Sequence, residues 1–361
     1  MSHSEEEMAE INDIREANVF KGITFSEFKK TDVIKEFIKS LLEGKLEPAC
    51  YWCAELICAG HYLDLWDAII IFFSKYIHIG NPKLVHYIDL RCTQFKNILK
   101  NGYIGQEIRL RNHRLIRKLF AEICIILNYS KKKHPLSEVK IKQEELETSE
   151  YYYKYKAPDL SYADDYLMDE DLKDIIVPLN EFTYHLAVDG SSVDACYWLE
   201  WLVEFEKKCR AQHIAILGRR NLSEVESKYQ KDMAFCIWSI ILGESCKRGE
   251  LVKRTIKSSF QLFCLKYTSG CFKKRKFLLY FSIEMLTTHI ATFPPIMEDK
   301  SKIEQLISNL NIIYKQIKKN EISPGTDYLF NQDNNNNLEK TIEKLDTMRE
   351  LQDVFIPRIE K

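Results

Sequence analysis

The sequence predicts an all-α fold, and three observations lead to this prediction. The 361-residue chain has only 12 glycines and 9 prolines, a scarcity that long helices tolerate better than turn-rich β structure does. Apolar residues recur at helical spacing along most of the chain. The tetrapeptide Ala49-Cys50-Tyr51-Trp52 returns as Ala195-Cys196-Tyr197-Trp198, and an apolar, Glu-containing pattern follows each copy. We therefore expect two diverged helical-bundle units, and we interpret the repeat as an internal duplication.

The first helical unit is expected over residues 20–130, after an acidic N-terminal segment at residues 1–19. The spacing of Ser4 and Glu7 fits a capping box and predicts a short helix over residues 4–17. Apolar periodicity, interrupted by glycine or proline, predicts the further helices of this unit. Their expected ranges are 25–42, 49–59, 63–76, 83–99 and 106–127.

An acidic, tyrosine-rich linker is expected over residues 131–175, because acidic residues greatly outnumber lysines in its second half. Its tyrosines argue against complete disorder, since they can dock on a neighbouring surface. The second helical unit is expected over residues 176–296. It holds the second copy of the tetrapeptide, a helix at 232–242, a basic amphipathic stretch to residue 280 and a last helix that ends at residue 290. C-terminal helices at 301–319 and 338–351, with an Asn-rich loop between them, complete the chain at residues 297–361.

Composition narrows the functional classes. The formal net charge of −1 gives no overall field that favours nucleic acid or an anionic membrane, so any such preference must come from local clustering. The eleven cysteines lie among apolar neighbours, as free thiols do in a reducing compartment. The acidic N-terminus does not resemble a signal peptide, and no apolar run is long enough to span a bilayer. We expect an intracellular protein without a membrane partner.

No catalytic motif appears in the sequence. The phosphate-binding patterns G-x-x-x-x-G-K-[ST] and G-x-G-x-x-G are absent, as are G-x-S-x-G and H-E-x-x-H. Cys50, Cys53, Cys58 and His61 have the composition of a zinc site, but on one helix they would spread over about 16 Å, too far for one ion. We predict that these cysteines pack in the core. The expected protein is no enzyme and has no catalytic residue, metal or cofactor.

The strongest sign of function is a run of basic residues between positions 247 and 276, in which Glu250 is the acidic exception. Phe260, Phe263, Tyr267 and Phe272 are interleaved with the basic residues. Such a pattern can neutralise phosphates and is a candidate nucleic-acid surface, whereas the alternative is a solvated face or one neutralised by the acidic linker. The candidate residues are Lys247, Arg248, Lys253, Arg254, Lys257, Lys266, Lys273, Lys274, Arg275 and Lys276. A weaker counterpart in the first unit consists of Arg109, Arg111, Arg114, Arg117 and Lys118.

Residues 48–127 resemble the helical C-terminal region of clamp-loader-related AAA+ proteins of the replication-associated recombination protein A (Werner-interacting protein) group. The resemblance rests on Ala49-Cys50-Tyr51-Trp52, Gly60, the apolar stretch from Leu65 to Phe73, and the segment from Ser74 to Pro82 with Ile77 and Gly80. It implies that Tyr51 and Trp52, and with them Tyr197 and Trp198, are core packing residues of a collar-like unit. Because the chain lacks the ATPase motifs, the resemblance implies oligomerisation and scaffolding rather than ATP hydrolysis.

The whole chain also resembles an uncharacterised protein family of large nucleocytoplasmic DNA viruses, through the segments 197–206, 230–232 and 323–330. This resemblance implies residence in the cytoplasm or viral factory of a host cell, with the virion left open. We expect a non-enzymatic scaffold or adaptor in viral DNA replication, repair or transcription. Protein partners are expected, and nucleic acid and self-association are left open. The leading alternative is a structural or packaged virion protein that makes protein–protein contacts only. A third option is an enzyme whose site cannot be recognised from one sequence.

Overall fold

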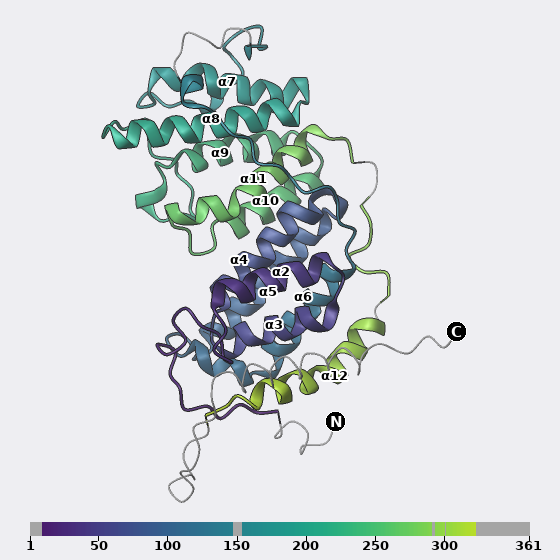
Figure 1. The fold of residues 1–361 in the computed structure, drawn as a ribbon. Coiled ribbons are helices and arrows are strands. Elements are labelled where there is room, and N and C mark those ends of the chain that lie inside the picture. The colour runs from purple at the N-terminus through teal and green to yellow at the C-terminus, as the bar shows by residue number, and fades with distance from the viewer. Residues whose placement is uncertain (1–8, 147–153, 291–292, 300, 323–361) are drawn as a thin grey trace, which may run out of the picture. The chain divides into compact units, whose positions relative to one another are not determined.

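The computed structural model describes residues 9–146, 154–290, 293–299 and 301–322, and within these ranges the fold is all-α, as predicted (Figure 1). Over the same ranges the extended structure amounts to an isolated bridge between Ile23 and Lys29. The described helices include none with the length and apolar character needed to cross a bilayer. The α-helices are α2 (Lys30–Leu42), α3 (Leu46–Cys58), α4 (Tyr62–Phe72), α5 (Lys83–Lys100), α6 (Arg114–Tyr129), α7 (Ile176–Tyr184), α8 (Ser192–Ala211), α9 (Met233–Cys246), α10 (Glu250–Phe263), α11 (Phe272–Thr287) and α12 (Ser301–Lys318).

The chain forms two compact units whose boundaries differ from those drawn from the sequence. Unit 1 contains the described residues within Met1–Ile69, Thr93–Ser130 and Met297–Lys361, whereas unit 2 contains those within Ile70–Cys92 and Lys131–Ile296. The boundary therefore falls inside α4 and α5, and the acidic segment 131–175 belongs to unit 2. Periodicity locates helices along the chain but does not say which apolar face packs on which, so it could not place this boundary.

The predicted helix at residues 4–17 is wrong for residues 9–17, which are not helical. Ala9 and Ile11 are buried. The Ile11 backbone N–H donates to Oδ1 of Asn112 at 2.9 Å, and the Asn112 side-chain amide donates to the Ile11 carbonyl at 2.8 Å. Arg117 donates to the Ala9 carbonyl at 3.0 Å. These tertiary hydrogen bonds satisfy the backbone groups that a helix would otherwise pair. The predicted helix at 338–351 lies outside the described residues.

The two helices that carry the repeated tetrapeptide have similar neighbours in their own units. In unit 1, α3 packs against α2 and α6; in unit 2, α8 packs against α7 and α9 (Figure 1). The chain between α3 and α6 contains α4 and α5, whereas an irregular segment with one short 3₁₀ turn connects α8 to α9. This insertion accounts for the unequal spacing of the two copies. The arrangement is the one that an internal duplication would produce, and the duplication remains a hypothesis.

The acidic segment is attached to unit 2 by its tyrosines. Tyr155 stacks on Trp198 with ring centroids 5.8 Å apart. The Tyr166 hydroxyl donates to Glu244 of α9 at 2.8 Å, and its ring lies against Gly243, where a Cβ would come within 2.4 Å of the phenol oxygen. Glycine at position 243 therefore allows this close approach. Most acidic side chains of the segment remain exposed while its aromatic ones make the contacts.

Asp171 attaches this segment through a buried ion pair with Arg220. Its carboxylate accepts hydrogen bonds from both terminal nitrogens of Arg220, at 2.9 and 2.7 Å, and the exposed side-chain fractions are 1% and 3%. The backbone N–H groups of Gly218 and Met168 also donate to it, at 2.8 and 3.0 Å. Burial by itself disfavours the ionised carboxylate, but these hydrogen bonds and the guanidinium charge outweigh it and lower the pKa of Asp171.

This lowered pKa predicts a loss of stability in acid. An Asp in an unfolded chain has a pKa of about 3.9, so the contribution of Asp171 is fully present above that value and disappears as the pH falls through the folded pKa. We expect the free energy of unfolding, measured in urea at pH values from 7 down to 3, to fall more steeply below about pH 4 for the wild type than for Asp171→Asn. Parallel pH profiles for the two proteins would contradict this assignment.

Candidate functional site

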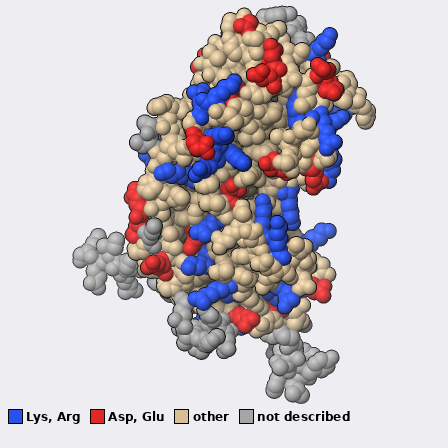
Figure 2. Space-filling view, turned by 180° about the vertical axis from the view of Figure 1, so that it is seen from behind, with Lys and Arg blue, Asp and Glu red and all other residues tan. Residues whose placement is uncertain are grey.

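Eight of the ten predicted basic candidates are exposed, and three of them share one side of α10. Lys253, Arg254 and Lys257 are spaced i, i+1 and i+4, whereas the intervening Thr255 and Ile256 are buried. We call these three residues the cationic face of α10. Figure 2 shows lysine and arginine side chains in groups on the surface, with acidic side chains interspersed. The other exposed candidates are Lys247, Arg248, Lys266, Lys273 and Lys274.

Acidic residues neutralise little of this face. Arg254 lies 3.8 Å from Glu250, and both side chains are largely exposed. Lys247 pairs with Glu244 at 2.7 Å, outside the cationic face. Exposed ion pairs contribute about 0–1 kcal/mol each, so solvent and salt compete readily with the pair of Arg254 and Glu250. The cationic face therefore keeps most of its capacity to attract an anion.

Arg275 and Lys276 do not belong to the binding surface, and their assignment to it was wrong. Arg275 is fully buried and donates to the carbonyls of Phe263 and Leu265, at the C-terminal end of α10. Lys276 is buried and pairs with Glu138 and Glu200. Burial of these two cations is tolerated because each has hydrogen-bonding acceptors. They hold unit 2 together and are inaccessible to a polyanion.

The interleaved aromatic residues are not a stacking platform either. Phe260, Phe263 and Tyr267 are buried, and Phe263 stacks on Tyr267 with centroids 5.3 Å apart. Phe272 is half-buried and meets Phe263 edge-on at 6.4 Å. Burial raises the pKa of Tyr267, as does the nearby carboxylate of Asp232, so its phenol is neutral. The regular spacing of these aromatic residues therefore reflects their packing in the core between α9, α10 and α11.

The weaker basic group of unit 1 is also divided between core and surface. Arg111 and Arg117 are buried, and their donors bind backbone carbonyls of the N-terminal segment. The Arg117 guanidinium also lies 3.8 Å from the ring centre of Tyr314. Arg109, Arg114 and Lys118 are exposed. The two buried arginines hold the N-terminal segment in place, whereas the other three residues of this group lie on the surface.

The four residues of the predicted core signature are located largely as the resemblance implies. Tyr51, Trp52 and Trp198 are buried, whereas Tyr197 is half-buried. The Tyr197 hydroxyl donates to Glu145 at 2.8 Å, and Trp201 donates to the Glu145 carbonyl. The helix that carries the second copy of the motif thus also hydrogen-bonds to Glu145 of the acidic segment.

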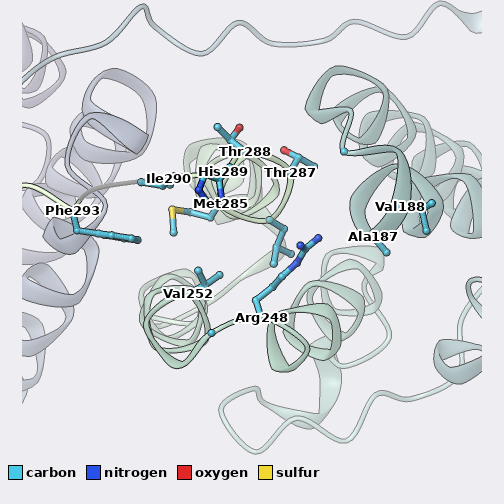
Figure 3. Close-up of a pocket in the computed structure, with 13 residues that line it drawn as sticks. Ala187, Val188, Arg248, Val252, Met285, Thr287, Thr288, His289, Ile290 and Phe293 are labelled. Carbon is cyan, nitrogen blue, oxygen red and sulfur yellow. The ribbon is translucent and has the colours of Figure 1, made fainter.

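A pocket of about 450 Å³ opens in unit 2 where α10 begins and α11 ends (Figure 3). Its walls come from three stretches that are distant in sequence, so no local sequence pattern could indicate it. One is the end of the π-helix η8 (His185–Asp189) with Gly190, the second is the start of α10, and the third comprises residues 285–290 together with Phe293. Figure 3 shows the Arg248 side chain extending toward the end of α11 that carries Thr287, with Phe293 to the left and Val188 to the right.

The pocket carries positive charge without a balancing acid. Among its lining residues, Arg248 and His289 can be cationic, and Thr287 and Thr288 carry hydroxyl groups, whereas no Asp or Glu lines it. The N-cap of α10 is Gly249, whose side chain cannot satisfy the first N–H groups of the helix. Those N–H groups carry partial positive charge. The remaining lining is apolar, so the pocket suits a ligand with an anionic group and an apolar or aromatic body.

Cys124 of α6 lies within hydrogen-bonding reach of Cys50 and Cys53 of α3, but these three thiols are not arranged to share one ion. Among the described residues, the one group of three or more His, Cys, Asp or Glu ligand atoms close enough to share an ion is His185, Asp189 and Asp194. His185 Nδ1 lies 2.8 Å from Asp189, and Lys156 donates to Asp194 at 2.7 Å, so nearby cationic or polar groups already occupy these carboxylates. His61, a member of the sequence cluster, hydrogen-bonds to the Ile23 carbonyl at 2.7 Å.

The structure thus defines an all-α protein with a cationic helix face beside a pocket free of acidic residues. In comparisons with known proteins, no family model, curated protein or solved structure matches the chain.

Proposed function

We propose that the protein is a non-enzymatic helical scaffold that binds the backbone of nucleic acid through the cationic face of α10. The observation that carries this proposal is the exposure of Lys253, Arg254 and Lys257 on one side of a helix, with Glu250 as the nearby acid. Three cations on one rigid helix can follow successive phosphates. The sequence resemblances support a role in viral DNA replication, repair or transcription.

The burial of the aromatic residues favours contacts with phosphates over stacking of bases along this face. Single-strand binding surfaces combine cations with exposed aromatic rings, but Phe260, Phe263 and Tyr267 are in the core. We therefore propose binding that depends strongly on salt and little on sequence.

Reversal of charge on this face should weaken binding to DNA. We expect the triple substitution Lys253→Glu, Arg254→Glu and Lys257→Glu to lower affinity for a short duplex at low salt. It should also make the negative slope of log K against log salt concentration shallower by about 3, since each phosphate contact contributes about 0.9 to the magnitude of that slope. Fluorescence anisotropy with a labelled duplex over a salt series measures both quantities.

The matched control reverses three exposed lysines of unit 1, Lys21, Lys35 and Lys39, and so produces the same change in net charge. This control should retain the wild-type salt slope. If wild-type binding is undetectable at low salt, or if the control loses as much affinity as the α10 variant, the nucleic-acid proposal fails. A role confined to protein–protein contacts would then be favoured.

A further inference from the structure

The pocket lies directly beside the cationic face of α10. Arg248 and Gly249 immediately precede α10, and Val252, which also lines the pocket, is the neighbour of Lys253 in the chain. The exposed cations thus continue along the first turns of the helix to the pocket mouth. A strand whose phosphates lie along the cationic face would bring its next nucleotide to this opening.

The chemistry of the pocket separates into two parts that match the parts of a nucleotide. The Arg248 side chain has no hydrogen-bond or ion-pair partner among the described residues, and a guanidinium can bind a phosphate through two parallel hydrogen bonds. His289 and the Thr288 hydroxyl add further polar groups, whereas the Thr287 hydroxyl donates to the Ile283 carbonyl at 2.9 Å. Val252, Met285, Ile290 and Phe293 supply the apolar wall against which a base can pack (Figure 3).

We propose that this pocket binds one unpaired, phosphate-bearing nucleotide at the end of a strand that lies along the cationic face of α10. The inference rests on the proposed nucleic-acid function and adds a preference for unpaired ends. A paired base cannot enter the pocket without leaving the stack, which costs a few kcal/mol, whereas an overhanging nucleotide enters without that cost. The volume of about 450 Å³ lies within the range of small-molecule sites.

The test compares a blunt duplex with the same duplex carrying a short 5′-phosphorylated single-stranded overhang. We expect the wild type to bind the overhang duplex about tenfold more tightly. Val188→Trp should abolish this preference and leave affinity for the blunt duplex unchanged, because the large side chain would fill the pocket mouth from a position that is 61% exposed and tolerant of size. The matched control is Val193→Trp, an exposed position that does not line the pocket.

A second pair of variants distinguishes the phosphate contact from general electrostatics. Arg248→Gln should remove the preference for the phosphorylated overhang, whereas Arg254→Gln should weaken binding to both duplexes equally. Adenosine 5′-monophosphate in excess should compete for the overhang preference, and inorganic phosphate at the same concentration should not. Competition by inorganic phosphate alone would reduce the pocket to a simple anion site and overturn the proposal.

Two further results, both from the duplex comparison, would overturn the pocket inference and leave the proposed function intact. One is equal binding of blunt and overhang duplexes by the wild type, both sensitive to reversal of the cationic face. The other is an overhang preference that Val188→Trp and Arg248→Gln leave unchanged. Displacement of fluorescent adenosine monophosphate by an acidic peptide but not by an oligonucleotide would assign the pocket to a protein partner. Loss of all DNA binding in the wild type would instead defeat the proposed function itself.

Discussion

Arg275→Glu should lower the free energy of unfolding by about 3–5 kcal/mol, because it removes a buried cation and places a carboxylate against backbone carbonyls. The native guanidinium is fully buried and donates to the carbonyls of Phe263 and Leu265, at 2.9 and 2.5 Å. A helix ends with carbonyls that have no intrahelical partner, and Arg275 of α11 satisfies carbonyls at the end of α10. Urea unfolding followed by circular dichroism measures the loss.

The matched control is Lys273→Glu, two residues earlier on the same helix. Lys273 is exposed and lies in the first turn of α11, where a negative charge is favourable. We expect its effect on stability to stay within about 0.5 kcal/mol. Arg275→Lys should give an intermediate loss, since one ammonium group cannot reproduce the fork of the guanidinium. Equal stability of Arg275→Glu and Lys273→Glu would contradict the buried, carbonyl-capping role.

The contrast between Lys273 and Arg275 shows where the sequence alone reaches its limit. Both residues belong to one basic run, but their side chains point about 160° apart on a helix. The sequence indicates which of two such residues faces solvent only when the helix has a clear apolar stripe. In α11 the residues from Arg275 to Ile283 are all buried, so the period does not reveal which basic residue faces solvent. On α10 the apolar period is clear, and there the exposed cations could be predicted.

The same reasoning explains what was predicted about the fold. Helical period, the glycine breaks and the repeated tetrapeptide depend on local sequence, and they indicated the all-α class and most helices. The division into units and the extended N-terminal segment depend on contacts over long sequence separation, such as that of Asn112 with Ile11. The pocket likewise requires three distant stretches to meet. None of these features leaves a local pattern, so all of them emerge only from the structure.

The other large expected effect concerns the acidic segment. We expect Asp171→Ala to lower the free energy of unfolding by about 3–5 kcal/mol, since it leaves the buried Arg220 without its counter-charge. Arg220 also touches the sulfur of Cys236 at 3.0 Å, but burial raises the pKa of that thiol to about 11, so it is neutral at pH 7. Asp171 therefore supplies the negative charge that Arg220 needs. The exposed pair of Glu226 and Lys228 is the control, and Glu226→Ala should cost less than about 1 kcal/mol.

A double-mutant cycle separates the value of the ion pair from the cost of an orphaned charge. Arg220→Met removes the cation but keeps an apolar side chain of similar length, and it should be costly alone because Asp171 then stays buried without its partner. In the double variant Asp171→Ala with Arg220→Met neither charge remains. We expect this variant to recover a large part of the loss, as replacement of a buried ion pair by apolar groups often does. Additive losses from the two substitutions would show that the pair is not coupled and that the segment is attached by its tyrosines instead.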